Sequence, residues 1–528
     1  MEEIFKYALL FWRIAMNGYF ILGLLFWGIV VLFFYILRKS SQLHAVTMEV
    51  IDNKKKKKIL AVMVTVILGC ILPMGGCPIW NGEIPEHRNQ YEVLAESILQ
   101  GHFYVDNNDI DPRLLEMENP YDTALRTELG VNFKWDHAYY NGHYYVYFGV
   151  VPVFLLFLPY RIITGTALTT YHATQIFVIM FIIGIFLLFY LLTERFFNKI
   201  TFGMYLMMSS CFSVISIWYS IEAPALYCTA ITSGLCLEVW SLYFFVKAVW
   251  GEENENSRKS ICYAFFGSLM GALAFGCRPP VALANILVLP LLVEYLRKRK
   301  INIALVKQLL FAASPYVIVA VLLMAYNYSR FDSFFEFGQA YQLTVADQSS
   351  YGNIIGQFSL IKILNGILSN FISYSPISSE FPYISLNGAF INFPLLFFPI
   401  IALSHETVRN MLKREHLWNF IKVLLFMPVL VTAVDVLWVP ALSERYRMDI
   451  YWLMGILCFM IIGCYYKSLP ENLRKKFSYY ISNFAFISIF ICFLLFIVPN
   501  DLNVTDCSPE LLEIIKKVFT FGFSQASS

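Results

Sequence analysis

The sequence predicts an all-α polytopic membrane protein. Of the 528 residues, 58% are hydrophobic and only 14% are charged, which is far more apolar than a soluble domain. The mean hydropathy is +0.60, and apolar runs of about 17 to 25 residues, the length that a helix needs to cross a bilayer core, recur along the chain. The net charge of +2 is too small to indicate a polyanion such as nucleic acid as a partner.

About twelve apolar runs are long enough to be membrane-spanning helices. They lie near residues 17–37, 59–76, 168–193, 200–219, 224–248, 260–276, 281–296, 303–325, 386–404, 418–440, 448–466 and 477–499. The first run is too long for a cleavable signal and no small-residue cleavage site follows it, so we expect it to remain as an anchor. The apolar run at 146–160 is short for a span, and we expect an interfacial or re-entrant helix there.

Lys and Arg are distributed unevenly between the two sides of the predicted bundle. More than half of them fall in six short loops on one side, at 38–58, 194–199, 249–259, 297–302, 405–417 and 467–476. The positive-inside rule makes these loops cytoplasmic, which leaves both termini outside. Two long segments, about 77–167 and about 326–385, are then also outside. Because long loops are uncommon in compact folds unless they are functional, we expect these two to meet over one face of the bundle and to carry any chemistry.

This pattern divides the chain into five parts. They are an N-terminal anchor with a basic cytoplasmic loop (1–58), a transmembrane core that includes the first external loop (59–325, with the loop at 77–167), the second external loop (326–385), the C-terminal transmembrane helices (386–499) and an external interfacial tail (500–528). In the tail, Ser508 is a capping residue and Pro509 a favourable first helical residue. Leu511, Leu512, Ile515, Val518 and Phe519 share one face, so we expect this helix to lie flat on the outer leaflet.

The most informative stretch is WDHAYYNGHYYVYFG, from Trp135 to Gly149, in the first external loop. An aromatic belt at the bilayer surface explains its rings but not its acid and two histidines. Those three side chains can move protons or bind a cation, and tyrosine rings are of the kind that hold a sugar. The candidate residues here are Asp136, His137, Tyr139, Tyr140, His143 and Tyr145.

A second dense stretch opens the same loop, at Pro85–Asp106. Tyr91, Leu94, Ala95, Ile98 and Leu99 recur at helical spacing, which predicts an amphipathic helix directly after the second span. Glu83 and Glu86 stand at its start, where a carboxylate gains from the helix dipole and from free N–H groups. The functional alternative is that Glu86, held rigidly at the membrane surface, is a general base.

These stretches resemble a known family. The run Tyr-x-x-x-Ala-x-x-Ile-Leu-x-Gly from Tyr91 to Gly101, directly after an early span, is similar to the first external loop of the GT-C membrane glycosyltransferases. The group in question contains the protein O-mannosyltransferases and the aminoarabinose transferases. YFGVVPVFLLFLPY, from Tyr147 to Tyr160, resembles the Pro-containing juxtamembrane helix of that group, and the chain looks closest to bacterial members with a WDHAYYNG-like stretch.

The resemblance implies a membrane-bound transferase with a polyprenyl-phosphate sugar as donor, an acceptor that enters from the outer side, and an acid of the first loop as base. In the family the acidic pair stands four and three residues before the Tyr, where this chain has His87 and Arg88. Glu86 is one position out of register, so Asp136 is an alternative base or a partner of Glu86. A second acid of the family can also orient the acceptor or a divalent cation, which leaves a requirement for Mg²⁺ or Mn²⁺ open.

Further candidates lie at three other predicted outer boundaries. They are Arg278 in GCRPP, Glu336 and Gln339 in the stretch that opens the second external loop, and Glu444, Arg445 and Arg447 at the start of the eleventh span. An Arg fork binds phosphate oxygens well, and Arg445 is our first choice for the donor phosphate, with Arg278 or Arg447 beside it. For Arg278 the alternative is a lone cation whose side chain extends to the membrane interface. For Arg445 the alternative is an Arg–Glu pair that fixes helix ends.

The sequence therefore predicts a multi-pass glycosyltransferase of the bacterial plasma membrane with its active face outside. It would move a sugar from a lipid phosphate to an acceptor hydroxyl by a single displacement that inverts the anomeric configuration. The acceptor, a wall polymer, a lipid or a protein, is not specified by the sequence. A polytopic transporter or a flippase for lipid-linked sugars is the alternative, although few ionisable residues lie mid-span and no two halves of the chain match.

Overall fold

The computed structural model describes residues 18–74, 89–106, 110–224, 226–251, 257–297, 299–344, 346–349, 355–439, 442–498 and 509–523. Within these ranges the chain is mostly helical, and nine helical segments are long and apolar enough to cross a membrane. The predicted fold class, an all-α polytopic membrane protein, is confirmed.

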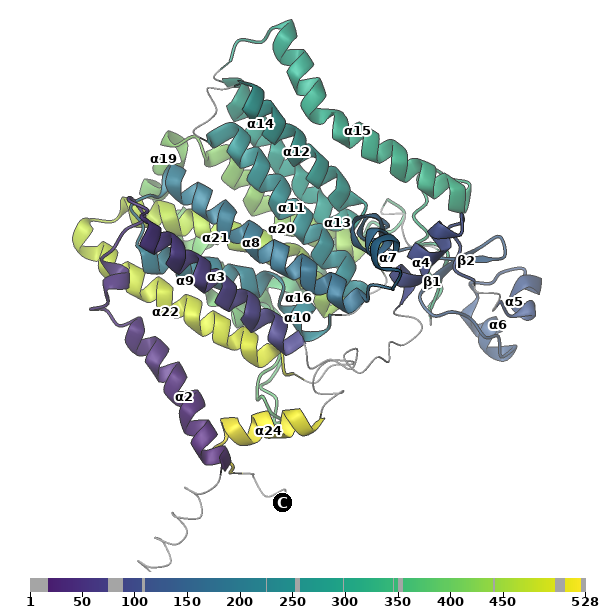
Figure 1. The fold of residues 1–528 in the computed structure, drawn as a ribbon, viewed down its shortest axis with the longest axis horizontal. Coiled ribbons are helices and arrows are strands. Elements are labelled where there is room, and N and C mark those ends of the chain that lie inside the picture. The colour runs from purple at the N-terminus through teal and green to yellow at the C-terminus, as the bar shows by residue number, and fades with distance from the viewer. Residues whose placement is uncertain are drawn as a thin grey trace, which may run out of the picture.

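The nine segments correspond to nine of the predicted spans. They are α2 (Gly18–Ile36), α3 (Asn53–Met74), α8 (Thr170–Phe196), α11 (Leu226–Trp250), the broken run of α13 (Pro279–Ala282), η6 (Leu283–Leu287) and α14 (Val288–Arg297), α15 (Ile303–Phe331), α20 (Trp418–Trp438), η8 (Glu444–Arg447) with α21 (Met448–Ser468), and α22 (Glu471–Leu495). Figure 1 shows them as a bundle, with α2 and α15 at opposite edges.

The other three predicted spans are shorter or less apolar. The run at 200–219 forms α9 (Phe202–Ser216) followed by α10 (Trp218–Glu222), and that at 260–276 forms α12 (Ser257–Phe275), whose first turn is basic. The run at 386–404 is divided into α17 (Ala389–Asn392), η7 (Pro394–Phe397) and α18 (Phe398–Ser404). Here Pro394 and Pro399 each occupy the first turn of a new helix, where a missing N–H costs nothing.

The core of the bundle is built around α11 and α21. Helix α11 packs against α8 on one side and α12 on the other, and α21 packs against α9 and α20. Phe189 of α8 stacks on Phe459 of α21 with 3.9 Å between ring centroids. Shorter helices complete the described chain. They are η1 (Gln42–His44), α4 (Gln90–Leu99), α5 (Pro112–Glu116), α6 (Thr123–Glu128), η4 (Val153–Phe157), α7 (Leu158–Thr164), α16 (Leu360–Ile372), α19 (Glu406–Arg414) and α24 (Pro509–Phe519).

The two long segments meet, as predicted, and they do so through a small β-sheet. Strands β1 (His137–Tyr140) and β2 (His143–Tyr145) form a hairpin, and β3 (Gln342–Leu343) from the second segment pairs antiparallel with β1. The turn consists of Asn141 and Gly142, both at positive φ, as a two-residue hairpin turn requires. This sheet is an addition to the expected all-helical architecture.

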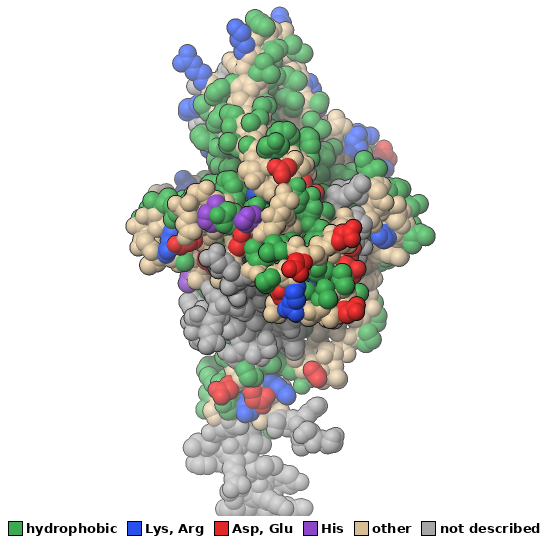
Figure 2. Space-filling view, turned by 90° about the vertical axis from the view of Figure 1, so that its right-hand side faces the viewer, with side chains coloured by type: hydrophobic (Ala, Val, Ile, Leu, Met, Phe, Trp, Pro, Cys, Tyr) green, Lys and Arg blue, Asp and Glu red, His purple; other side chains and the backbone are tan. Residues whose placement is uncertain are grey.

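The lobe around the sheet carries polar and charged side chains on the face seen in Figure 2. Figure 2 looks at this end of the molecule and shows Asp, Glu and His side chains scattered over the lobe, whereas the surface above it is mostly hydrophobic. The contrast is what a protein needs when its helices are surrounded by lipid and the loop lobe lies in water.

The predicted juxtamembrane helices are present. Helix α4 buries Tyr91, Leu94 and Ala95 as expected, but Leu99 at its end is 50% exposed and was wrongly placed on the buried face. The short apolar helix is also confirmed, although it covers Val153–Thr164 and starts later than expected.

The tail helix begins at Pro509 as predicted, while Ser508 lies outside the described residues. Three residues of its predicted apolar face contact protein, because Leu512, Ile515 and Phe519 pack against Phe381 of the second long segment, whereas Leu511 is 38% exposed. Helix α2 also holds α24, since its Trp27 Nε1 donates to the carbonyl oxygen of Phe519 at 3.0 Å. The prediction that α24 also lies flat on the outer leaflet stays untested.

The segment after β2 passes unusually close to the end of α12. Val151 N donates to the carbonyl oxygen of Gly276 at 3.0 Å. A Cβ atom at Gly149 would lie 2.3 Å from the carbonyl oxygens of both Gly276 and Cys277, so this approach requires glycine.

Replacing Gly149 by Ala should therefore destabilise the protein by about 1 to 3 kcal/mol, the usual cost of overpacking. The measurement is thermal unfolding of the detergent-purified protein. Gly69→Ala in α3 is the matched control, because a Cβ there meets nothing within 4 Å. An unfolding midpoint for Gly149→Ala equal to that of the control would contradict the close packing.

Candidate functional site

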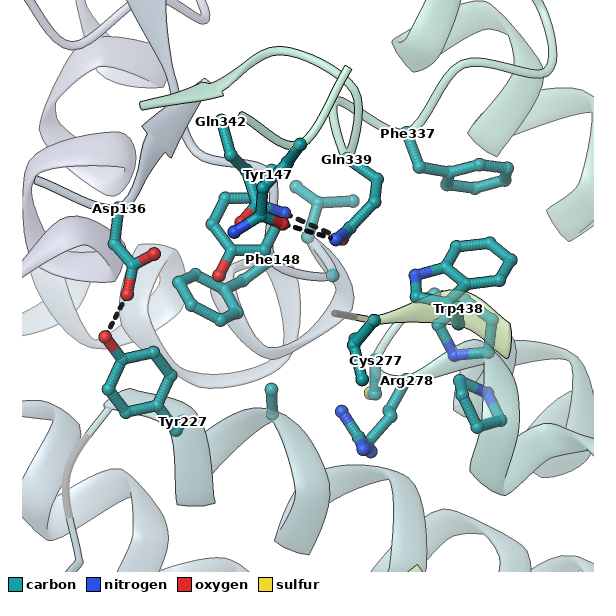
Figure 3. A pocket seen from close by; sticks show the side chains of 18 of the residues that line it. Asp136, Tyr147, Phe148, Tyr227, Cys277, Arg278, Phe337, Gln339, Gln342 and Trp438 are labelled. Atoms are coloured by element: carbon teal, nitrogen blue, oxygen red, sulfur yellow. Dashed lines mark hydrogen bonds between the residues drawn. The ribbon is translucent and has the colours of Figure 1, made fainter. Parts of the chain in front are cut away.

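A cavity of about 470 Å³ lies at one end of the helix bundle, beneath the sheet. It is placed where α11 begins, where α12, α15 and α20 end, and where η8 begins. The cavity brings together four of the residues predicted from the sequence, namely Asp136, Arg278, Gln339 and Arg445. Figure 3 shows the first three of them. Because they come from four distant parts of the chain, their meeting is a property of the fold.

Asp136 is fixed by its backbone as well as by its side chain. Its φ of 56° lies in the left-handed region, which Asp tolerates better than most residues. Its N–H donates to Leu343 O at 3.0 Å, and its carbonyl oxygen accepts from Gln90 Nε2 at 2.9 Å. The side chain points into the cavity, where one carboxylate oxygen accepts a hydrogen bond from the Tyr227 hydroxyl (Figure 3). Unusual backbone held in place from two sides is a feature of functional positions.

Arg445 lines the cavity as a cation that is held by aromatic rings. Its guanidinium lies over the Tyr227 ring, 4.3 Å from the centroid, and 5.2 Å from the Tyr446 centroid. Among the described residues it forms no hydrogen bond or ion pair, although it is partly buried. Cation–π contacts hold such a group in place without neutralising its charge. Arg445 is therefore oriented for an anion that comes from outside the chain.

Arg278 has a different environment. Its Nη2 lies 2.6 Å and its Nε 2.8 Å from Asp449 Oδ2, and Nη2 is also 3.6 Å from Asp435. The guanidinium covers the Tyr446 ring at 4.6 Å, so both arginines contact the same tyrosine. The two carboxylates neutralise Arg278, which makes it a weaker anion ligand than Arg445.

Most of the predicted rings of the hairpin do not line the cavity. Tyr139 packs against Tyr144 inside the loop lobe, and Tyr145 packs against Phe331. Tyr140 lies 4.7 Å from the Tyr341 ring. These positions show that the tyrosines build the lobe rather than the wall of the cavity.

The two histidines of the hairpin also point elsewhere. His137 is buried, and its Nδ1 contacts the carbonyl oxygen of Trp135 at 2.8 Å. His143 Nδ1 pairs with Asp106, whose other oxygen accepts from the backbone N–H of Tyr144. This contact joins the hairpin to the segment after α4.

Three other predicted residues lie outside the cavity lining. Glu336 accepts from the Gly338 N–H at 2.6 Å and so shapes its own turn. Glu444 is exposed at the start of η8. Arg447 is buried, and its Nη1 has no hydrogen-bond partner among the described residues. Glu86 and its neighbours His87 and Arg88 are not among the residues described.

The described donors do not fit a divalent cation site at Asp136. The nearest predicted partner in sequence, His137, is turned toward the backbone of Trp135. Within the described ranges no three His, Cys, Asp or Glu side chains are grouped as metal ligands. We therefore derive no step of the chemistry through a bound cation.

The structure adds one site residue that the sequence did not reveal. Tyr227 contacts both Asp136 and Arg445, but it lies in an apolar run whose composition indicates only a membrane helix. Of the rings in the predicted 135–149 stretch, Tyr147 and Phe148 do line the cavity, with ring centroids 4.1 Å apart. Burial raises the pKa of Tyr147 well above its usual value, so this hydroxyl stays protonated and can donate. No local signal distinguishes these rings from the packed ones of the hairpin.

The chain shows little similarity to known proteins. No protein-family model matches the sequence, and no curated protein is similar to it. One solved structure has a related arrangement, the archaeal oligosaccharyltransferase AglB from Archaeoglobus fulgidus in complex with an inhibitory peptide and a dolichol-phosphate. It shares 12% identity over 89% of this chain with a TM-score of 0.39, and the match covers 56% of AglB, so this chain spans about half of that protein's length. A similarity this low does not establish a shared function.

Helix α4, which carries Gln90 to the site, is attached to the bundle through a buried acid. Glu92 Oε1 accepts from the N–H of Thr170, the first residue of α8, at 2.6 Å. Burial raises the pKa of Glu92 from its ordinary value of 4.5 to about 8, while the Thr170 hydrogen bond opposes that shift. Between these values the folded protein holds a proton that the unfolded chain has released, so stability falls as the pH rises.

We expect Glu92→Gln to remove this loss and to be more stable than the natural protein at about pH 9. The difference should be at least about 1.4 kcal/mol, the value of one pKa unit. Thermal unfolding at about pH 5 and about pH 9 measures it. Glu96→Gln, one turn further along α4 in a partly exposed pair with Arg161, is the control and should keep the natural pH dependence. Parallel pH profiles for Glu92→Gln and the natural protein would contradict the assignment.

Proposed function

We propose that this protein is a membrane glycosyltransferase that moves a sugar from a polyprenyl phosphate to an acceptor hydroxyl on the outer face of the membrane. The observation that carries the proposal is the arrangement of Asp136, Tyr227 and Arg445 in one cavity. Tyr227 contacts both charged groups: its hydroxyl donates to the Asp136 carboxylate, and its ring lies against the Arg445 guanidinium, which forms no ion pair with a described residue. Such a pair suits a reaction in which a proton leaves one reactant and negative charge develops on the other.

The position of the cavity supports a lipid-linked donor. It is bordered by the ends of membrane helices on one side and by the loop lobe on the other. A lipid phosphate lies at the depth where helices end, and a water-soluble acceptor reaches that depth from the side of the loops. A guanidinium that forms no ion pair with a described residue is costly at this depth unless an anion joins it, and a phosphate is the anion that lipid supplies.

Asp136 is the base that the geometry favours within the described residues. A carboxylate has two oxygens and about four lone-pair sites, so it can accept from Tyr227 and from an acceptor hydroxyl together. It takes the proton of that hydroxyl as the oxygen attacks the anomeric carbon. Tyr227 holds the carboxylate in one orientation, which lowers the entropic cost of the reaction. Glu86 remains the second candidate from the sequence.

The leaving group requires charge stabilisation rather than a proton. As the bond from the anomeric carbon to the phosphate oxygen breaks, the electron pair moves to the phosphate, and Arg445 neutralises it. Arg278 lies over the Tyr446 ring, 4.6 Å from its centroid, and its own charge is balanced by Asp449. A single displacement of this kind inverts the anomeric configuration.

Asp136→Asn and Glu86→Gln separate the two candidates for the base. The variant that lacks the base should lose about 10²- to 10⁴-fold in kcat, because that is the usual contribution of a general base, while its affinity for the donor persists. The assay measures polyprenyl phosphate released from a lipid-linked sugar by the purified full-length protein. Tyr140→Phe, a change in the packed part of the hairpin, is the control and should keep most of the activity. If the double variant of Asp136 and Glu86 transfers sugar at the natural rate, the proposed mechanism is wrong.

Arg445→Gln should lower kcat about 10²- to 10³-fold, as expected when one group that stabilises developing charge is removed. Arg445→Lys keeps the charge but loses the planar fork, so it should retain an intermediate rate. Arg414→Gln, which changes an exposed arginine in α19, serves as the control. Equal loss in the Lys and Gln variants would argue that Arg445 acts through packing and not through its charge. Movement of lipid-linked sugar across vesicles without release of polyprenyl phosphate would favour a transporter instead.

A further inference from the structure

One wall of the cavity consists of amide side chains from the second long segment. Gln342 Nε2 lies 2.7 Å from Gln339 Oε1, and Gln339 Nε2 lies 3.0 Å from Gln348 Oε1. Gln348 Nε2 in turn lies 3.1 Å from the Thr344 hydroxyl, which donates to the carbonyl oxygen of Ala346 at 2.9 Å. All three glutamines line the cavity, and Figure 3 shows Gln339 and Gln342 on the same side of it.

These amides keep hydrogen-bonding capacity after they have bonded to one another. An amide has two N–H donors and a carbonyl oxygen with two lone pairs. The hydrogen bonds between described residues use one N–H of each glutamine and one lone pair of Gln339 and of Gln348. Gln339 and Gln342 are only 9% and 3% exposed, and the unused Gln342 Oε1 is not among the fully buried atoms that lack a partner, so it is open to the cavity. A row of buried amides with spare donors and acceptors is a matched surface for hydroxyl groups, which also donate and accept.

The rest of this region suits a sugar ring. Tyr147 and Phe148 border the cavity beside the amides, and Phe337 and Trp438 lie on the far side of Gln339 in Figure 3. Aromatic faces cover the C–H surface of a sugar, while amides bind its rim of hydroxyls. The tyrosines of β1 and β2 do not combine with the amides in this way, because they pack into the lobe and do not line the cavity.

The amide row has a fixed position relative to Asp136. Gln342 lies in β3 and pairs with Ala138 of β1. The next residue, Leu343, accepts a hydrogen bond at its carbonyl oxygen from the N–H of Asp136 itself at 3.0 Å. At the other end, Arg126 Nη2 donates to Thr344 O at 2.9 Å. Hydroxyls bound by the amides would therefore be held in register with the carboxylate.

We propose that Gln339, Gln342 and Gln348 bind neighbouring hydroxyls of the transferred sugar and determine which sugar the enzyme accepts. This inference rests on the proposed glycosyltransferase function and names the part of the donor that the second long segment recognises. A site built for hydroxyl groups discriminates strongly against a donor that lacks one, because a buried amide is then left unpaired. The preferred donors are sugars with at least two free adjacent hydroxyls at the bound edge.

The test compares sugar preference in the purified full-length protein. A panel of polyprenyl-phosphate sugars, glucosyl, galactosyl and mannosyl, identifies the accepted donor, and deoxy analogues of that donor remove one hydroxyl at a time. For the natural protein we expect at least one deoxy analogue to lose about 100-fold or more in kcat/KM. Gln342→Met and Gln339→Met should reduce that ratio at least about 10-fold, whereas inhibition by sugar-free polyprenyl phosphate stays unchanged.

Gln357→Met, in the same long segment but outside the cavity lining, is the matched control and should keep the natural ratio. Gln348→Met, which changes the least buried of the three amides, supplies the measurement if the other two variants fail to fold. Active variants with an unchanged ratio between hydroxyl and deoxy donors would overturn the inference alone. A natural protein that releases polyprenyl phosphate from no donor of the panel would overturn the proposed function as well.

Discussion

The pairing of β1 with β3 is the interaction on which the site depends. It joins two segments that are far apart in the sequence, and it does so through backbone hydrogen bonds that leave side chains free for other contacts. From this pairing, Asp136 receives its unusual backbone conformation and Gln342 receives its place on the cavity wall. Two short strands are weak alone, so the packing of α4 and the hairpin lobe around them supplies the stability that the sheet lacks.

A second constraint comes from the two arginines that share the Tyr446 ring. Arg278 is paired with carboxylates of α20 and α21, whereas Arg445 forms no ion pair with a described residue, lies over the Tyr227 ring and interacts only electrostatically with Asp449. The buried acids thus lower the cost of Arg278 more than that of Arg445. This division would be invisible in a count of charges, because both arginines occupy helix boundaries.

The sequence predicted the parts of the structure that depend on local composition. The lengths of α8, α11 and α22, the start of α24 at Pro509 and the buried face of α4 follow from runs and spacings within one segment. The hairpin was not predicted from the sequence, although Asn141 and Gly142 are a strong turn signal. Tyr227 and Gln342 were beyond prediction, because their roles depend on contacts between segments that share no local pattern.

The order of elements along the chain has a consequence for how the protein is made. The strand β3 follows α15, so the sheet is incomplete until that helix has been synthesised and its end has reached the side of the loop lobe. Until then the hairpin edge that β3 covers is exposed, and the cavity has no amide wall. A nascent chain stopped within α15 would contain Asp136 and most of the membrane bundle, yet it would lack the binding pocket. Completion of the cavity is thus a late step of biogenesis, separated in time from insertion of the first spans.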